Sequence, residues 1–409
     1  MESRSNDLHV LIVGGGSAGL LIAQVLQKVN ITCTVFEQDI TPFARPRDWN
    51  FGIYWAQSRL DECLSDEKRA KIVTVQTDPS YVPSESSVMP VHNGQTGELM
   101  KNLPAPWSLR IHRRRWLKML ADGIDIQFGK KLESIERGEE SVTITFTDGT
   151  KATGNLLIGA EGAHSVVREY LFGAEEAALI PSPVVASVTI CKISREASLK
   201  LRALHPRYII TFHPNGVFTW MSKDPANWTR MMMQTWRSEE DTGLMGKGNE
   251  EVKLKTWYEM GREFGPPFDE IFATMDPKSP IWHNRLGYWP TKPWDGKGPI
   301  TLAGDAAHPM TFHRGQGLNN AITDAADLLQ HLRNMKAPTP LELAAAVKRY
   351  EAELVPRGRE AVLASNENTN AVHDWATMMD SPLFKGGMAK EGDRIEVPIE
   401  KKANKVQTS

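Results

Sequence analysis

Cysteine is scarce in this chain: its 409 residues include only Cys33, Cys63 and Cys191. The three are far apart and form no C-x-x-C pair, so the sequence provides neither a disulfide framework nor a zinc site. Free thiols are typical of a reducing compartment, and we expect a cytoplasmic protein. The motifs H-E-x-x-H and G-x-S-x-G are also missing, so we expect no metal site and no catalytic triad.

An excess of positive charge is missing as well, because 48 Lys and Arg residues face 50 Asp and Glu residues. Nucleic acid is therefore not an expected partner, since phosphate binding needs a clustered basic excess. The uncharged apolar stretch 10–26 is shorter than the roughly 20 residues of a spanning helix, and three glycines divide it. We expect no membrane span.

Two patterns of hydrophobic residues divide the chain. Short β-branched and apolar runs predict buried strands at 9–15, 32–38, 155–160 and 298–305, and residues 17–29 have helical spacing. The first two strands and this helix make a βαβ unit of about 30 residues. Between Pro181 and Pro290, short alternating segments predict an antiparallel sheet instead. Helices are expected at 317–335 and 340–353.

The first glycine-rich turn fits the pattern G-x-G-x-x-G with Gly14, Gly16 and Gly19. Glycine is needed there for a tight turn, for close approach to a pyrophosphate and for packing of helix on strand. The start of the following helix favours phosphate through its free N–H groups. Glu37 ends the second strand, where a carboxylate can accept hydrogen bonds from a ribose diol. The pattern predicts a bound dinucleotide and leaves NAD and FAD open.

Two later motifs give the chain a resemblance to a known family. GAEGAHSVVR (159–168) is similar to a D-G-x-x-S-x-V-R segment, and GDAAHPMTFHRGQGLNNAITDA (304–325) to a G-D-A-A-H-P segment with a G-Q-G-x-N helix start. With the glycine turn, they resemble the class A flavoprotein monooxygenases related to p-hydroxybenzoate hydroxylase, fungal members especially. The resemblance covers residues 10–330. It implies FAD, transient NAD(P)H, and O2 delivered to a substrate through a flavin hydroperoxide.

The resemblance also implies the fold class. We expect an α/β protein with a Rossmann-like FAD-binding domain, an inserted antiparallel substrate-binding sheet and C-terminal helices. The FAD-binding domain is expected to be discontinuous, and the proposed ranges are 1–75, 100–178 and 285–360 for FAD, 76–99 and 179–284 for substrate, and 361–409 for a C-terminal helix and flexible tail. No second glycine turn follows a strand, so NAD(P)H is expected in a shared cleft. We expect a monomer or homodimer.

Several residues are assigned to FAD by the same resemblance. Asp305 matches the carboxylate that holds the ribityl hydroxyls, and the helix start after Gly315 matches one whose N–H groups face the flavin ring. Arg113 matches an arginine that contacts FAD, and Arg45 and Arg47 lie on a loop near the cofactor. The expected FAD contacts are Gly14, Gly15, Gly16, Ser17, Ala18, Gly19, Glu37, Arg113, Asp305, Gly315, Gly317, Leu318 and Asn319.

Other positions are expected to be structural or to depart from the family pattern. Ser165 and Arg168 are interpreted as structural or near the pyridine nucleotide. Glu161 stands where the family usually has Asp, so an extra methylene must be accommodated there. Phe312 stands where the family usually has proline beside the flavin. Unlike proline, phenylalanine does not fix the backbone angle φ, and it adds a large ring. The substitution therefore predicts a bulky apolar pocket wall.

The predicted antiparallel sheet is rich in tryptophan and methionine, with seven of the twelve tryptophans in residues 220–294. Core packing accounts for most of them, but alternating strand positions can also line a cavity over the flavin. Together with the family resemblance, this composition implies a hydrophobic, electron-rich substrate such as a prenylated phenol, an indole or a polyketide aromatic. The pocket candidates are Tyr208, His213, Phe218, Met231, Met233 and Phe312; for Tyr208 and His213 a structural role is the stronger interpretation.

Three other activities share parts of this pattern. A flavin halogenase would need a W-x-W-x-I-P segment, and no two tryptophans here are two positions apart. A flavoprotein oxidase, dehydrogenase or ene-type reductase remains open, as does a non-redox FAD-dependent cyclase or isomerase. Monooxygenation is the leading hypothesis.

Overall fold

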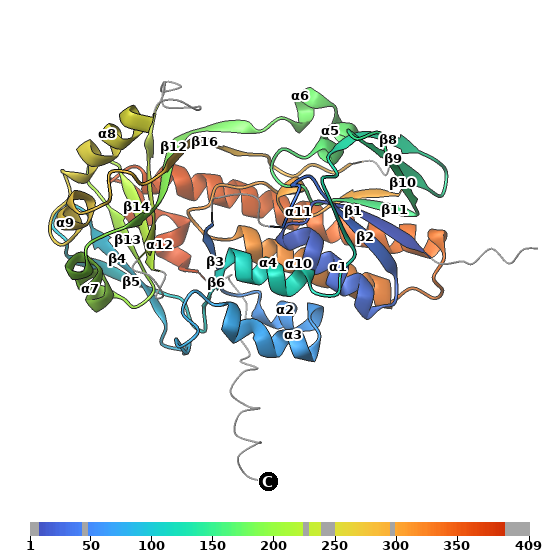
Figure 1. The fold of residues 1–409 in the computed structure, drawn as a ribbon, viewed down its shortest axis with the longest axis horizontal. Coiled ribbons are helices and arrows are strands. Elements are labelled where there is room, and N and C mark those ends of the chain that lie inside the picture. The colour runs from blue at the N-terminus through green and yellow to red at the C-terminus, as the bar shows by residue number, and fades with distance from the viewer. Residues whose placement is uncertain (1–7, 43–47, 224–228, 239–249, 295–298, 389–409) are drawn as a thin grey trace, which may run out of the picture.

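The computed structural model of the protein describes residues 8–42, 48–223, 229–238, 250–294 and 299–388. A parallel sheet and a larger antiparallel sheet lie at opposite ends of an elongated molecule (Figure 1). The long helix α11, Pro340–Val372, runs between them. Within these described ranges, none of the helices combines the length and the apolar character that crossing a membrane requires.

The parallel sheet has the strand order β17-β11-β1-β2-β7. Its central strand β1 pairs with β2 through Val10 and Cys33 and with β11 through Val10 and Leu156. The strands β1, β11 and β17 are mostly apolar because elements cover both faces of the sheet, whereas β2 also carries Thr32, Thr34 and Glu37. The strands and the covering elements are β1 His9–Val13, β2 Thr32–Glu37, β7 Ile126–Phe128, β11 Leu156–Gly159, β17 Ile300–Leu302, α1 Ser17–Lys28, α2 Gln57–Cys63, α4 Arg113–Ala121, α10 Gly317–Arg333, β8 Leu132–Arg137, β9 Val142–Phe146 and β10 Lys151–Gly154.

The second sheet has seven strands in the order β16-β12-β15-β14-β13-β4-β5, and only β4 and β13 pair in parallel. Helices α7, α8 and α9 cover its outer face, at the left of Figure 1. The inner face packs on the end of α11 and on α12. The elements are β4 Val88–Asn93, β5 Leu99–Pro104, β12 Ile180–Lys192, β13 Tyr208–Phe212, β14 Phe218–Lys223, β15 Thr229–Arg237, β16 Ile281–Tyr288, α7 Arg195–Leu204, α8 Glu250–Gly261, α9 Phe268–Ala273 and α12 Pro382–Gly386.

A short two-stranded ladder lies between the two large sheets. It pairs β3, Asn50–Ile53, with β6, Leu109–His112, in antiparallel register, and Gly52 lies opposite Arg110. Smaller helices follow α2 and the strand β11, namely α3 Asp66–Lys71, α5 Val166–Phe172 and α6 Ala174–Ala177.

The C-terminal helices differ from the sequence expectation. The helix expected at 340–353 and the one expected after residue 360 are a single helix, α11, which continues through Pro356. A proline inside a helix removes one hydrogen bond and costs about 3 kcal/mol. Burial of Leu354 and Val362 on the same helix offsets that cost, because helix stability in proteins comes mainly from packing. The tail expected to be flexible, 389–409, lies outside the described residues.

A buried carboxylate on α10 joins three parts of the fold. Asp324 Oδ2 accepts hydrogen bonds from the Gly304 N–H and from His308 Nε2, each at 2.7 Å, and its Oδ1 accepts one from Arg357 Nη2 at 2.7 Å. Burial alone raises the pKa of Asp324, but His308 and Arg357 together outweigh it and lower the pKa to about 2. The carboxylate is therefore ionised at neutral pH.

We predict that Asp324→Asn lowers the free energy of unfolding at pH 7 by about 3 kcal/mol, because breaking a buried ion pair leaves a charge without its partner. This loss of stability is at the low end for such a change because Arg357 still has Asp327 as an ion-pair partner, 3.2 Å away. A folded-state pKa of about 2, against an ordinary value of 3.8, means that the stabilisation is present above the ordinary value and is lost as the pH falls towards 2.

Urea unfolding of both proteins between pH 7 and pH 2 measures this difference. The gap between wild type and variant should close at the acidic end. Asp148→Asn, at an exposed pair with Lys130, is the matched control and should change little. Equal stability of Asp324→Asn and wild type at pH 7 would contradict the prediction.

Candidate cofactor and substrate site

The turn between β1 and α1 requires glycine at both of its ends. A Cβ on Gly14, whose φ is +110°, would lie 2.4 Å from the Ala160 carbonyl oxygen. A Cβ on Gly19 would lie 2.0 Å from the Gly14 carbonyl oxygen, so α1 packs directly on its own strand. By contrast, a Cβ on Gly16 would meet no atom within 4 Å. The turn thus offers open space beside its backbone, as a pyrophosphate cradle needs.

Glu37 lies against this turn. Its Oε2 accepts a hydrogen bond from the Gly15 N–H at 2.8 Å, and its Oε1 accepts one from the Asp39 N–H at 2.9 Å. Each carboxylate oxygen keeps a further lone pair for a ribose hydroxyl. The side chain of Ser17 accepts a hydrogen bond from Trp116 Nε1 at 3.1 Å, which fixes α4 beside the turn.

The segment containing Asp305 is in direct contact with the start of α1. Gly304 has a φ of +59°, and a Cβ there would lie 2.6 Å from the Cβ of Ala18. On its other side, a Cβ on Gly317 would lie 3.7 Å from Asp305 Oδ1. Asp305 therefore lies between the N-terminal ends of α1 and α10, two positions favourable for negative charge.

The Asp305 carboxyl is exposed to solvent, although protein atoms surround it densely. These surroundings raise its pKa by desolvation, and Asp324 raises it further, whereas His308 and Arg168 lower it. A carboxyl that is costly to charge gains from hydroxyl donors. The ribityl hydroxyls of FAD would supply such donors.

The loop before α10 turns at Gly315, whose φ is +62°. The first N–H groups of α10 have no acceptor within the helix, so they are available to a ligand. The side chain of Asn319, however, accepts a hydrogen bond from the Tyr54 N–H at 2.8 Å and donates to the Gly52 carbonyl at 3.1 Å. Asn319 thus anchors the segment after β3, which leaves only its backbone N–H for the FAD contact predicted from the sequence.

Arg113 begins α4, and its guanidinium carbon lies 5.1 Å from the centre of the Trp49 ring. Its neighbour Arg115 donates to the Gln76 carbonyl at 3.0 Å and is structural. The other two candidate arginines, Arg45 and Arg47, lie outside the described residues.

The second motif is structural. Glu161 Oε1 accepts a hydrogen bond from the Val167 N–H at 2.8 Å, so the longer side chain still reaches the start of α5. Ser165 caps the same helix by accepting from the Arg168 N–H at 2.9 Å. The Arg168 guanidinium is buried and donates to three backbone carbonyls, those of Ala163, Ala177 and Ala306. Arg168 thereby fixes the backbone next to Asp305.

Four of the pocket candidates lie in or against the inner apolar cluster of the large sheet: Tyr208, Phe218, Met231 and Met233. His213 does not. It follows β13 on the opposite face, where its Nε2 lies 3.1 Å from the Glu263 carbonyl oxygen and its ring lies 5.1 Å from Phe264. These contacts favour the structural interpretation of His213 over substrate orientation, because strand alternation turns it towards the outer helices.

The sixth candidate, Phe312, is half-buried, and its ring lies 4.5 Å from that of His313. His313 is buried, with its ring edge-on to Phe218 at 4.9 Å. It lies within hydrogen-bonding distance of Thr235 and Thr369, at 3.0 and 2.8 Å. Burial lowers the pKa of His313 well below its usual range, so it is neutral at pH 7. The loop thus holds a neutral imidazole against the inner face, with the Phe312 ring beside it.

Two residues of this site, Tyr54 and Arg110, were not predicted from the sequence. Tyr54 is buried, and its ring lies 3.2 Å from where a Cβ on Gly315 would be. Arg110 is buried on β6, and its guanidinium carbon lies 4.3 Å from the centre of the Trp220 ring. Arg110 carried a usable signal, since it is a lone cation inside the apolar run SLRIH. Tyr54 lies in a stretch whose hydrophobic residues show no clear period, so the sequence carried no signal for it.

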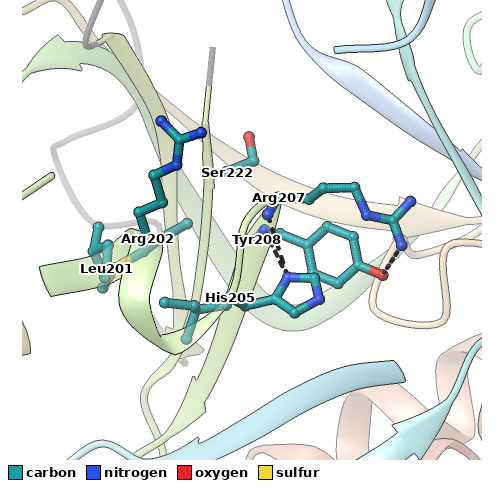
Figure 2. A pocket seen from close by; sticks show the side chains of 8 residues that line it. Leu201, Arg202, His205, Arg207, Tyr208 and Ser222 are labelled. Carbon is teal, nitrogen blue, oxygen red and sulfur yellow. Dashed lines mark hydrogen bonds between the residues drawn. The ribbon is translucent and has the colours of Figure 1, made fainter. Parts of the chain in front are cut away.

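Figure 2 shows a small cavity at one end of β13 and β14, beside α7. Its volume is about 10 Å³, room for roughly one water molecule. Arg207 points towards the Tyr208 hydroxyl there, with Nη2 and the hydroxyl oxygen 3.4 Å apart. This cavity is separate from the glycine turn and is not the cofactor site.

Comparisons with known proteins agree with this geometry. Residues 114–363 match the FAD binding domain family. The chain is 48% identical over 394 residues to the FAD-dependent monooxygenase cctM of Talaromyces islandicus. The aligned residues cover 95% of this chain and 98% of that protein. It is 33% identical to the FAD-dependent monooxygenase phnB of Penicillium herquei, in an alignment that covers 94% of this chain and 95% of that protein. Its fold matches the crystal structure of Klebsiella pneumoniae HpxO complexed with FAD and uric acid, with a TM-score of 0.73, 20% identity and 92% of both chains covered.

We predict that Gly16→Val abolishes FAD binding with little effect on the flavin-free fold. The new side chain would enter the open space beside the turn and occupy the pyrophosphate position. The φ of Gly16 is −81°, which any residue adopts, and replacing glycine at a helix start costs about 1 kcal/mol or less. Flavin absorbance of the purified protein and urea unfolding of the flavin-free form measure the two effects.

Two further variants calibrate the result. Gly386→Val also faces open space and should keep its flavin. Gly19→Val should destabilise the fold itself, because its side chain would overlap the Gly14 carbonyl. Retention of a full complement of FAD by Gly16→Val would show that the pyrophosphate lies elsewhere.

Proposed function

Because this chain belongs to the class A FAD-dependent monooxygenases, we propose that it uses NAD(P)H and O2 to hydroxylate or epoxidise a hydrophobic, electron-rich small molecule, aromatic or prenylated. One oxygen atom of O2 enters the substrate and the other leaves as water, while NAD(P)H and a proton supply the reducing equivalents. The observation that carries the proposal is the contact of Gly304 with Ala18. It brings the glycine turn and Asp305 together on one side of the parallel sheet.

In this proposal FAD lies along the line from Glu37 to α10. Glu37 accepts the adenosine ribose hydroxyls, the turn around Gly16 holds the pyrophosphate, and Asp305 accepts the ribityl hydroxyls. The N–H groups at the start of α10 face the flavin ring, where their partial positive charge stabilises negative charge on reduction. The residues fit this cofactor because the space beside Gly16 is open and Asp305 is exposed.

Bound FAD supplies the activation of dioxygen, which no amino-acid side chain provides. The protein's part is to hold the substrate near the ring and to exclude water. We assign the holding role to the inner face of the seven-stranded sheet, which carries Phe218, Met231 and Met233 and whose Phe218 ring lies against His313, next to Phe312. This division makes the parallel-sheet part the cofactor domain and the antiparallel sheet the substrate domain.

An isotope experiment tests the reaction class. Compounds from a panel of phenols, prenylated aromatics and indoles are first selected by their ability to stimulate NAD(P)H consumption. The product formed under ¹⁸O2 should then carry one labelled oxygen by mass spectrometry. Label confined to hydrogen peroxide would indicate an oxidase. Conversion without NAD(P)H would indicate a non-redox enzyme, and either result overturns the proposal.

The flavin-free Gly16→Val variant is the control for this experiment and should give no labelled product. Anaerobic reduction of the flavin by NADH and by NADPH, with and without the selected compound, identifies the coenzyme. Failure of both nucleotides to reduce the flavin would also contradict the proposal.

A further inference from the structure

A row of buried hydrogen-bonding side chains connects the loop before α10 with the C-terminal end of α11. Its members are three threonines and two histidines, and none of them is more than 5% exposed. Each side chain is linked to the next by a hydrogen bond of 2.7 to 3.0 Å. We call this set the threonine–histidine network; its members, in order, are Thr311, Thr369, His313, Thr235 and His373.

The network ends on a backbone carbonyl at each side. The Thr311 hydroxyl donates to the Ser365 carbonyl at 2.9 Å, and His373 Nδ1 lies 2.7 Å from the Thr369 carbonyl oxygen. A carbonyl oxygen can only accept a hydrogen bond, so the side chain must donate at both ends.

The number of hydrogens does not match the number of contacts. Six contacts join the members to each other and to the two carbonyls, and every contact needs one hydrogen. Three hydroxyls and two neutral imidazoles supply one hydrogen each, which makes five. One contact therefore lacks a hydrogen while both histidines are neutral, and a single added proton would complete the set.

The added proton can reside on either histidine. Thr235 Oγ1 lies 3.0 Å from His313 Nε2 and 2.7 Å from His373 Nε2. The hydroxyl can accept a hydrogen bond from one ring while it donates to the other. When it takes a proton from one ring and passes its own to the other, the positive charge moves between the two histidines. The network can thus carry a charge from the end of α11 to the loop before α10.

The network is neutral at pH 7 as long as no negative charge lies near it. Burial lowers the pKa of His313 well below its usual range and that of His373 to about 4. The histidines disfavour a charge on each other, and Arg237 on β15 disfavours one on His373. Arg314 follows His313 along the chain, and the carboxylates that act on it are on α11: Glu360 and Glu367.

The end at His373 is the better position for a proton arriving from solvent. His373 is the residue that caps α11, where the helix carries a partial negative charge. The carbonyls of Thr369 and Thr235 also raise its pKa, although burial outweighs them. The chain is exposed from Asp374 onwards, so this end of the network lies close to solvent.

The other end of the network lies beside the proposed flavin position. His313 is two residues before Gly315, on the loop that leads into α10, and its ring lies 4.5 Å from that of Phe312. In the proposed function, negative charge collects at the start of α10 when the flavin is reduced. A negative charge nearby favours the charged form of a histidine and opposes the effect of burial.

We propose that the threonine–histidine network takes up one proton when the flavin is reduced and releases it when the flavin is reoxidised. The inference rests on the proposed function, because it places the flavin ring at the start of α10. Hydride transfer from NAD(P)H brings two electrons and one proton to the ring and leaves one negative charge there. The second proton comes from water, enters at His373 and completes the sixth hydrogen bond.

The midpoint potential of the bound flavin tests this coupling. It is measured against redox dyes at several pH values, without NAD(P)H, substrate or O2. Each proton that accompanies the two electrons shifts the potential by about 30 mV for a tenfold change in proton concentration. We expect a slope of about 60 mV per pH unit at the acidic end, between the pKa of the network in the oxidised protein and its higher pKa in the reduced protein. At alkaline pH the slope should fall to about 30 mV.

Threonine variants locate the second proton. Thr235→Val removes two contacts and one hydrogen, so four contacts remain for four hydrogens and the neutral network is complete. Its slope should be about 30 mV per pH unit throughout. Thr369→Val removes two other contacts and one hydrogen and should behave in the same way, whereas Thr235→Ser should keep the wild-type slope.

Thr189→Val is the matched control, because Thr189 is equally buried in the same sheet and its hydroxyl donates to the Pro280 carbonyl at 2.9 Å, outside the network. It should keep the wild-type slope. Flavin content and thermal unfolding show which variants are folded, and either of the two network valines suffices for the test.

Two results would overturn the proposal. One is a wild-type slope of about 30 mV per pH unit over the whole range. The other is a wild-type slope retained by the folded valine variants, which would place the second proton on the flavin ring itself. Neither measurement involves oxygen transfer. A protein that binds no FAD would contradict the proposed function, whereas a holoenzyme that takes up only one proton would contradict the role of the network alone.

Discussion

The arrangement of the cofactor site depends on one buried carboxylate. Asp324 binds the Gly304 N–H, His308 and Arg357 at once, and these belong to the turn after β17, the following loop and α11. The turn could otherwise relax, because Gly304 has a left-handed backbone that few residues support. With the turn fixed, Asp305 faces outward between two helix starts. The buried carboxylate of Asp324 thus determines the position of the exposed residue Asp305.

The two sheets differ in pattern because they have different neighbours. The strands β1, β11 and β17 of the parallel sheet are buried and mostly apolar, whereas the seven-stranded sheet alternates between an outer face under α7–α9 and an inner face that closes the proposed pocket. Helix α11 bonds to α10 through Arg357 at its centre and reaches the antiparallel sheet at its end, where His373 lies 2.7 Å from Thr235. Helix α11 therefore connects the parallel sheet with the antiparallel sheet.

The sequence was most informative where function is local. Gly14 and Glu37 could be proposed as cofactor contacts because a turn needs glycine and a strand end presents a carboxylate within a few residues of it, and the family resemblance added Asp305. His213 could be named only as a candidate with a stronger structural interpretation, because one residue of uncertainty at the end of β13 reverses the direction of its side chain. Tyr54 and Arg110 meet only through β3, β6 and the far loop at Gly315, so no spacing along the chain could reveal their contact. The positions of these three residues depend on tertiary packing.

The contact of Gly304 with Ala18 has a consequence for how the holoprotein is made. During translation the glycine turn leaves the ribosome long before the segment that completes its binding site, and Arg357, which anchors Asp324, emerges later still. A nascent chain can form its first strands but has nothing to close around the adenine dinucleotide. Flavin uptake must therefore be one of the last events in maturation, and nearly full-length fragments should accumulate as colourless protein.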